Sequence, residues 1–545
     1  MGRLLTVASG VLTAAMGAVC TVANATTTLD VTRFGAVPDD GLDDRAAIQR
    51  ALDEACVRLD EQPGDALEVV FPPGRYQLEK PAQPPPEVPW VILRLRCGGF
   101  ALRGQVEDPA AAILHLADAQ GDFEALLAGE IFTTDVSDLR IANLTFDGNG
   151  ANNPVTDGDA TFDDVLLNRR HGIRAYVGRN IVIENNRFID WQTVNIVVLN
   201  GVDVANVVVQ DNRFEGIGTL NRTVPDWDHS SVFTDTAGAQ ILRNTFTSVG
   251  VGAFGVRAAI ETHGPRQFVF DNRVEAFTTG MNATGISALG GDTQRVSRNR
   301  FLRVSDGIRV WANEVPPNPP GEPTLRDCEI SDNLITIDVD GWRATQDPFG
   351  QAPKGIELEA RADGVIENLT LARNTIVYTN FANTVRPYDE NAAGILLAPF
   401  AEPTLPIRGL AIEDNLILRA PATGIYIGSY LPQGATIRGN RLIDIGIGPP
   451  VINDGFRSAF LLFGEYQDVT LENNCVIARR AGDGSAPPLA QGIYAFDRSL
   501  GGNVARNNGL LAAAGADIEW FLEAPGIGEP WAVEPPLAGC PAGGR

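Results

Sequence analysis

One short sequence element recurs along most of the chain and limits the folds that the chain can adopt. An asparagine is followed two residues later by Phe, Ile, Val or Leu, and successive copies are mostly 25 to 41 residues apart. The element begins at Asn186, Asn212, Asn244, Asn272, Asn299, Asn333, Asn374, Asn415, Asn440 and Asn474. A constant element separated by loops of variable length is typical of a solenoid, in which each repeat stacks on the previous one. Stacked Asn side chains at a turn can hydrogen-bond to the equivalent residues above and below.

A second repeat lies upstream of the asparagine elements and has the pattern of a β-strand, often beginning Gly-Ile. We align five-residue strands that begin at Gly172, Asn195, Ser231, Ala259, Gly285, Gly307, Gly355, Gly394 and Gly424. Their second residue is almost always Ile or Val, so a period of two places it in the core and directs the third and fifth residues outward. Two repeats that keep the same order along the chain predict an all-β parallel helix of strands.

The region before the repeats has a different pattern and carries a resemblance to a known family. Residues 45–56 have apolar residues at helical spacing after two aspartates, and residues 68–78 have the pattern of a strand, a Pro-Gly turn and a second strand. With the runs Asp30-Val-Thr-Arg-Phe-Gly-Ala36 and Phe71-Pro-Pro-Gly-Arg-Tyr76, this pattern resembles the opening of the pectate-lyase-like superfamily, which includes polygalacturonases, phage tailspikes and related glucanases. The resemblance implies a single-stranded right-handed parallel β-helix with an N-terminal helical cap.

We therefore divide the chain into four segments. Residues 1–25 combine Arg3, a mostly apolar stretch and Ala23-Asn24-Ala25, which is typical of a secretory signal peptide and predicts a secreted or periplasmic protein. We expect residues 26–134 to form the N-terminal cap and first coils, 135–515 the right-handed parallel β-helix, and 516–545 a C-terminal cover or tail. No later stretch is apolar for long enough to predict a membrane span.

The cysteines leave two interpretations open. After residue 25 the chain has Cys56, Cys97, Cys328, Cys475 and Cys540, without the C-x-x-C spacing of a zinc site. In an oxidising compartment Cys56 and Cys97 can form one disulfide bridge. Buried free cysteines that act as small apolar residues are the alternative.

The densest set of reactive side chains falls on two neighbouring strands of this alignment. Asp235 and His263 occupy the fifth position, whereas Phe233 and Glu261 occupy the third. Because neighbouring strands lie about 4.8 Å apart, Asp235 and His263 should be side by side, with Glu261 diagonal to Asp235. The segment Asp226-Trp-Asp-His229 precedes the first of these strands and can overhang the same place. A glycosidase needs two carboxyl groups, one to protonate the leaving oxygen and one to activate water or to attack. The candidate catalytic residues are Asp235, Glu261, His263 and Asp228.

Other outward positions supply candidate substrate contacts, because aromatic rings stack on sugar rings while polar groups bind the hydroxyls. The candidates are Arg174, Tyr176, Asp226, His229, Phe233, Arg257, Arg309, Trp311, Glu357, Glu359 and Tyr426. Arg309, Trp311, Glu357 and Glu359 form a second cluster, which is either a subsite or an alternative catalytic centre. Each of these residues taken alone also fits an ordinary surface position.

The net charge and the acidic residues limit the classes of partner and cofactor that the chain can bind. A formal net charge of −25 argues against nucleic acid or an anionic membrane surface as a partner, and it leaves a polysaccharide open. Asp226 and Asp228 could together bind Ca²⁺, but two acids are a weak signal for such a site, so we expect no cofactor.

These observations predict a secreted carbohydrate-active enzyme that hydrolyses a polysaccharide bound in a groove along the β-helix. The alternative is a lyase or epimerase acting on a uronate-containing glycan, with Arg309 or Arg257 neutralising the carboxylate and His263 or Tyr176 taking a proton. A non-catalytic glycan-binding surface protein is a third possibility. Thr234-Asp235 and His263-Gly264 resemble two parts of the polygalacturonase motif set, whose paired aspartates and Arg-Ile-Lys element are missing, so the substrate stays open.

Overall fold

Three parallel β-sheets run the length of the molecule and enclose one core. The computed structural model describes residues 26–64, 66–82, 91–121, 123–129, 134–153, 170–191, 195–217, 230–248, 258–277, 279–284, 291–304, 306–312, 324–339, 353–360, 365–380, 392–397, 407–428, 433–447, 457–479, 489–514, 516–523 and 530–540. Within these residues one sheet, sheet A, has 18 strands, and the other two, sheets B and C, have 14 each.

The strands of each sheet have the following bounds. Sheet A contains β1 (Thr27–Asp30), β2 (Leu67–Phe71), β5 (Ala101–Gly104), β8 (Arg140–Ala142), β11 (Val182–Glu184), β14 (Val208–Gln210), β17 (Gln240–Leu242), β20 (Phe268–Phe270), β23 (Arg295–Ser297), β26 (Thr324–Arg326), β27 (Glu329–Ser331), β30 (Val365–Glu367), β31 (Thr370–Ala372), β34 (Ile407–Glu413), β37 (Gln433–Arg438), β40 (Val469–Glu472), β43 (Val504–Arg506) and β46 (Ala532–Val533). Sheet B contains β3 (Gly74–Leu78), β6 (Ala112–Leu116), β9 (Thr145–Asp147), β12 (Arg187–Ile189), β15 (Arg213–Ile217), β18 (Thr245–Ser248), β21 (Arg273–Glu275), β24 (Arg300–Val304), β28 (Leu334–Asp338), β32 (Thr375–Thr379), β35 (Leu416–Leu418), β38 (Arg441–Ile443), β41 (Cys475–Ala478) and β44 (Gly509–Ala512). Sheet C contains β4 (Val91–Leu95), β7 (Ala125–Gly129), β10 (His171–Arg179), β13 (Asn195–Ala205), β16 (Ser230–Thr234), β19 (Ala258–Thr262), β22 (Thr279–Thr284), β25 (Asp306–Ala312), β29 (Ile356–Ala360), β33 (Ala393–Leu397), β36 (Thr423–Ile427), β39 (Ser458–Tyr466), β42 (Gln491–Ser499) and β45 (Glu519–Glu523).

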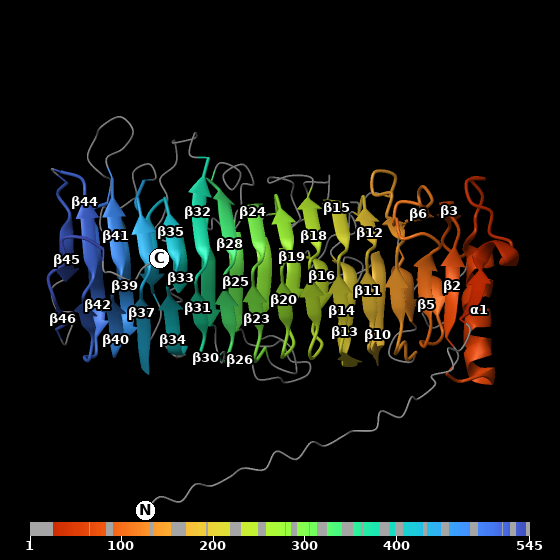
Figure 1. The fold of residues 1–545 in the computed structure, drawn as a ribbon, viewed down its shortest axis with the longest axis horizontal. Coiled ribbons are helices and arrows are strands. Elements are labelled where there is room, and N and C mark those ends of the chain that lie inside the picture. The colour runs from red at the N-terminus through yellow and green to blue at the C-terminus, as the bar shows by residue number, and fades with distance from the viewer. Residues whose placement is uncertain are drawn as a thin grey trace, which may run out of the picture.

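The chain visits the sheets in a fixed order. A typical coil runs through β10 in sheet C, β11 in sheet A and β12 in sheet B before the chain returns to sheet C at β13. Equivalent strands of successive coils then pair in parallel, as Val182 of β11 does with Val208 of β14. Figure 1 shows the coils stacked along the long axis, from the helix α1 (Arg45–Glu61) at one end to β45 and β46 at the other. The predicted parallel β-helix is confirmed.

Close approach between coils explains the repeated Gly-Ile pattern. A Cβ atom added to Gly307 would lie 2.2 Å from the carbonyl oxygen of Gly355, and one added to Gly355 would lie 2.4 Å from that of Gly394. The same atom on Gly394 would meet the Gly424 carbonyl oxygen at 2.7 Å. Since no side chain fits there, these glycines mark the point where the backbones of successive coils touch, and the Ile that follows each of them is buried.

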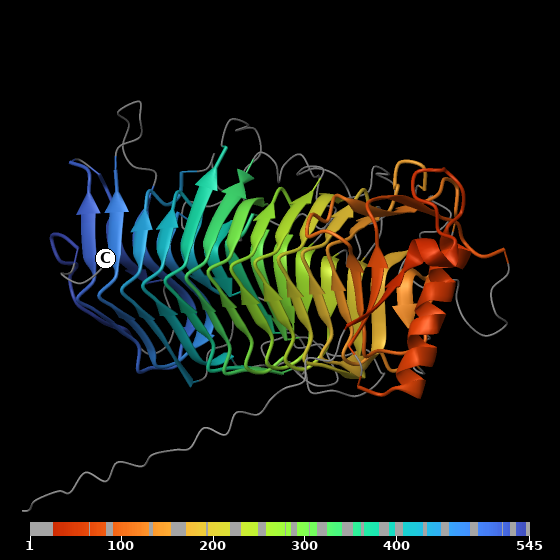
Figure 2. The ribbon, with the colours of Figure 1, turned by 45° about the vertical axis from the view of Figure 1, so that its right-hand side comes forward.

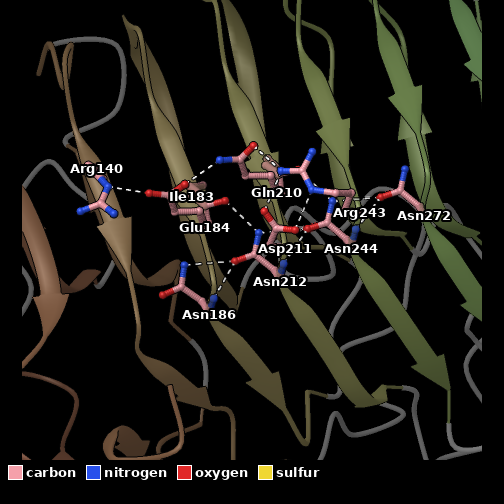
Figure 3. A network of polar contacts seen from close by, with 11 residues as sticks. Arg140, Ile183, Glu184, Asn186, Gln210, Asp211, Asn212, Arg243, Asn244 and Asn272 are labelled. Atoms are coloured by element: carbon pink, nitrogen blue, oxygen red, sulfur yellow. Dashed lines mark hydrogen bonds and ion pairs between the residues drawn. The ribbon is translucent and has the colours of Figure 1, made fainter. Parts of the chain in front are cut away.

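The recurring asparagines lie at the turn between sheets A and B and form a buried ladder (Figure 3). The main-chain N–H of Asn244 donates to Oδ1 of Asn272 at 2.9 Å, and the Asn244 side-chain amide donates to the same oxygen at 3.0 Å. The Asn244 amide also donates to the carbonyl oxygen of Val209 at 2.8 Å. Each asparagine therefore satisfies main-chain groups of a tight corner that water does not reach, and the predicted stacking is confirmed.

One helix covers the N-terminal end of the core, as Figure 2 shows. The buried face of α1 consists of Ala47, Ile48, Ala51, Leu52 and Ala55, all of which belong to the main apolar core. A disulfide between Cys56 of α1 and Cys97 ties the helix to the first coils, so the bridge that the sequence left open is present. Within the described residues, the helical part of the cap consists of this α-helix and the short 3₁₀ helix η1 (Val31–Phe34).

The C-terminal region continues the sheets. Strands β45 and β46 lie within residues 516–545, where we expected a cover or tail, and both pair with strands of the preceding coil. A second disulfide joins Cys475 to Cys540, while Cys328 is free and buried. The predicted signal peptide, residues 1–25, lies outside the described residues. Among the helices that the structure does describe, none is long and apolar enough to cross a membrane.

The register of sheet C corrects two strands of the sequence alignment. Arg174 pairs with Val198, one residue later than the alignment that began at Asn195. The next strand of sheet C after β19 is β22 (Thr279–Thr284), in which Asn282 pairs with Glu261. The strand that we placed at residues 285–289 is therefore wrong in position, and those residues lie outside the described part of the chain.

Candidate active site on the outer face of sheet C

The third position of the sheet C repeat forms a continuous column on the outside of the β-helix. The alternation of each strand puts residues such as Ile260 and Ile308 into the main core and their neighbours Glu261 and Arg309 outside it. Strand pairing gives the order of the column as Arg174, Val198, Phe233, Glu261, Asn282, Arg309, Glu357, Leu396 and Tyr426. Neighbouring members lie about 4.8 Å apart along the axis, so Glu261 and Arg309 are about 10 Å apart at the backbone.

The centre of this column holds a carboxylate–imidazole pair. Nε2 of His263 lies 2.8 Å from Oε1 of Glu261, and the His263 and Phe233 rings are 4.8 Å apart at their centroids. Glu261 is 4% exposed and His263 is 9% exposed. The second carboxylate oxygen of Glu261, Oε2, is buried and has no hydrogen-bond partner among the described residues. Buried carboxylate oxygens are normally satisfied, so this oxygen is available to a further polar group.

Asp235 lies on the coil next to this pair. The main-chain N–H of His263 donates to the Thr234 carbonyl oxygen at 2.8 Å, and Thr234 pairs with Thr262. Asp235 and His263 therefore occupy equivalent positions on adjacent strands, the arrangement that the sequence predicted. Gly264 follows His263 because the neighbouring coil passes too close for a side chain: an added Cβ would lie 2.3 Å from the Thr236 carbonyl oxygen.

A second cluster, two coils further along, contains buried charges. Arg309 Nε donates to Glu357 Oε2 at 2.9 Å, and Lys354 Nζ contacts the other oxygen of the same carboxylate. Burial raises the pKa of Glu357, but the charges of Lys354 and Arg309 outweigh it, so its pKa lies below the usual range of a glutamate. Glu359, two residues along the strand, is also buried. This cluster holds two cations in fixed positions on the same outer face as Glu261.

A third polar cluster lies toward the N-terminal end of the face. Glu124 Oε1 accepts from the Tyr176 hydroxyl at 2.6 Å and from the Arg174 guanidinium. Arg174 Nη1 also lies 3.0 Å from His171 Nε2, and its guanidinium carbon is 4.3 Å from the centre of the Tyr176 ring. Arg174 and Tyr176 were predicted as substrate contacts, whereas no repeat position pointed to His171 or Glu124.

Toward the C-terminus the residues of the column are apolar or aromatic instead of charged. Leu396, Tyr426 and Leu461 are fully buried in an apolar cluster separate from the main core, and Phe463 and Tyr494 pack against it. Tyr426, which we predicted as a substrate contact, is 1% exposed and serves as part of this packing. Its position therefore does not match the exposed role that the alternation suggested.

Some of the predicted site residues lie outside the part of the chain that the structure describes. Asp226, Asp228, His229 and Arg257 lie outside the described residues, and of Trp311 only the strand position is described. The Asp226–Asp228 pair considered for Ca²⁺ is therefore not described either. Within the described ranges no group of three or more His, Cys, Asp or Glu side chains has the arrangement of a metal site.

Comparison with known proteins agrees with this architecture. The sequence profile of the family described as rhamnogalacturonase A/epimerase, pectate lyase-like, matches residues 28–88. None of the curated protein sequences matches the chain. The tailspike protein of E. coli bacteriophage HK620 aligns with a TM-score of 0.53 and 14% identity over 83% of this chain and 75% of the tailspike chain. The surface protein and adhesin PfbA of Streptococcus pneumoniae aligns with a TM-score of 0.50 and 15% identity over 93% of this chain and 100% of its own. The profile match confirms the resemblance to the pectate-lyase-like proteins over residues 28–88, and the structural matches confirm the parallel β-helix fold.

Proposed function

We propose that the protein is a secreted polysaccharide hydrolase whose substrate lies along the outer face of sheet C. The observation that carries this proposal is the buried Glu261 carboxylate, which is held at one oxygen by His263 and whose other oxygen has no partner among the described residues. A sugar hydroxyl can donate to that oxygen, and a glycosidic oxygen can accept from it when the Glu261 carboxyl is protonated. The related folds include an HK620 tailspike solved in complex with a pentasaccharide, which supports a glycan as the ligand.

The proposed chemistry divides between two acids on adjacent coils. Glu261 protonates the leaving glycosidic oxygen, and Asp235 either activates water or attacks the anomeric carbon. His263 orients the Glu261 carboxyl through the 2.8 Å contact between Nε2 and Oε1. Hydrolysis consumes one water molecule and leaves one new reducing end for each bond that is cleaved.

A second candidate is favoured by the cations of the same face. Arg309 is buried two coils from Glu261 and Lys354 is buried three coils from it, while Arg174 lies at the N-terminal end of the column. Such cations fit the carboxylate of a uronate, which a lyase or epimerase must neutralise before a proton leaves the adjacent carbon. However, Glu357 and Glu124 already bind these three cations, which reduces the positive charge available to a substrate.

The test compares Glu261→Gln and Asp235→Asn with the wild type on plant, algal and bacterial polysaccharides. New reducing ends and the ultraviolet absorbance of unsaturated uronates are measured together, and binding is measured separately. We expect cleavage to fall by about 100- to 10,000-fold in both variants while binding persists, since general acid–base groups contribute rate factors of that size.

Glu275→Gln is the matched control, because Glu275 lies on sheet B and binds Arg273 and Arg303. It should keep wild-type activity. Full activity in Glu261→Gln would remove this residue from the mechanism. Absorbance that rises with cleavage would replace hydrolysis with elimination, and binding without any cleavage would favour a glycan-binding surface protein.

A further inference from the structure

A depression of about 610 Å³ lies on the N-terminal coils, on the outer face of sheet B rather than sheet C. Its walls come from the segment before α1, from β3 and from β6 with the turn that follows it. Its polar lining consists of Asp39, Arg75, Gln77, Glu79, His115, Asp118 and Gln120. Volumes of about 300–1,000 Å³ are usual for small-molecule sites, so the depression is large enough for an oligosaccharide segment.

The floor of the depression is formed by a chain of polar contacts from Arg75 through His115 to Asp147. His115 is 6% exposed, and its Nδ1 lies 2.8 Å from Oδ2 of Asp147 on the next coil. Its Nε2 contacts the guanidinium of Arg75. A guanidinium can only donate, so Nε2 accepts and Nδ1 carries the proton toward Asp147. The imidazole tautomer is therefore fixed, and the Arg75 guanidinium is held over the floor of the depression.

The walls are also held in place before any ligand binds. Asp39 Oδ1 accepts from the main-chain N–H of Arg75 at 2.9 Å, and Asp118 Oδ1 accepts from the Asn149 amide at 2.8 Å. The Gln120 amide bridges two segments, since Oε1 accepts from the Lys80 main-chain N–H at 2.6 Å and Nε2 donates to the Asp118 carbonyl oxygen at 2.8 Å. A site arranged in advance loses little entropy when it binds.

The chemistry of the lining selects the class of ligand. Three carboxylates, Asp39, Glu79 and Asp118, face one guanidinium, that of Arg75, so the lining repels an anion. Among the described lining residues there is no Phe, Tyr, Trp, Leu, Ile, Val or Met, which argues against an apolar ligand. Carboxylates accept, guanidinium donates and amides do both, which matches hydroxyl groups that both donate and accept.

We propose that this depression is a second saccharide-binding site, specific for a neutral oligosaccharide segment and separate from the face of sheet C. It binds without catalysing and holds a polymer at the N-terminal end of the β-helix. The proposal does not depend on hydrolysis at Glu261.

Hydrogen–deuterium exchange of the full-length protein locates binding directly. The probes are neutral gluco-, manno-, galacto- and xylo-oligosaccharides, with an oligogalacturonate as the charged comparison. At least one neutral probe should slow exchange in β3 and β6, and the oligogalacturonate should not. Arg75→Ala and Gln77→Ala should each weaken this protection at least tenfold, as measured by titration.

Arg187→Ala is the matched control, because Arg187 follows Arg75 in the same outward column of sheet B but lies outside the depression and binds Glu215. It should leave the protection of β3 and β6 unchanged. Protection in β3 and β6 by oligogalacturonate alone, or by no neutral probe, would overturn the proposal. Undiminished protection in both depression variants would also overturn it. Loss of cleavage at Glu261 has no bearing on these readouts, so failure of the two proposals is distinguishable.

Discussion

Replacing one asparagine of the buried ladder should weaken the β-helix at a defined point. In Asn272→Ala, the main-chain N–H and the side-chain amide of Asn244 both lose Oδ1 of Asn272, which they contact at 2.9 and 3.0 Å. The Ile241 carbonyl oxygen loses a donor at 2.8 Å. The buried Asn244 N–H left without this partner costs about 1–3 kcal/mol, and the Asn244 amide and the Ile241 carbonyl each lose one bond of about 1 kcal/mol, so we expect a loss of about 3–5 kcal/mol.

Native-state hydrogen exchange measures this loss where it occurs. Because every 1.4 kcal/mol corresponds to a factor of ten, the Asn244 amide should exchange at least about 100-fold faster in the variant. The control is Gln240→Ala, since Gln240 is exposed on the neighbouring strand β17 and its loss should change stability by less than about 0.5 kcal/mol. Exchange at Asn244 that matches the wild type would refute the ladder as a source of stability.

Three further perturbations have outcomes that the structure determines. Glu357→Gln should cost about 3–5 kcal/mol at neutral pH, because it leaves the buried charge of Lys354 short of its partner. The pKa of Glu357 is lower in the folded than in the unfolded protein. Its contribution to the free energy of unfolding is therefore present above the unfolded pKa of about 4.3 and is lost as the pH falls through the folded pKa. The urea midpoints of the variant and the wild type should accordingly converge in acid. Burial raises the pKa of Cys328 to about 11, so this thiol should resist iodoacetamide at pH 8 until the protein unfolds. Its contribution to stability should be lost as the pH rises through the folded pKa of about 11. Rapid labelling of the native protein would contradict its burial. Cys56→Ser should lower stability by at most about 4 kcal/mol, because the bridge to Cys97 closes a loop of 41 residues, and an unchanged melting temperature would count against that constraint.

Much of the architecture was predictable because it is periodic. Each ladder asparagine occupies the same corner of its coil, so its spacing in sequence reports the stacking directly. The register failed at β13, where Ile196, Val197 and Val198 are all buried and give no alternation to read. A strand that is covered on both faces has no polar residue to fix which side faces the core.

The candidate site was predictable only where its residues follow the same alternation. Glu261 and His263 lie two apart on one outward face, and the pattern identified both. Glu124 and Lys354 were missed because each lies just outside its strand, where no repeat position defines its direction. Their roles depend on contacts between coils that are distant in sequence, such as that between Glu124 and Arg174.

The mass balance of the products is the measurement that tests the central claim most directly. A defined oligosaccharide that the wild-type protein cleaves is incubated to completion, and all the products are weighed by mass spectrometry. Hydrolysis at Glu261 predicts product masses that sum to the substrate plus one water for each bond broken. Products that sum to the substrate alone would show elimination and would contradict the account, as would a substrate that is bound but never cleaved.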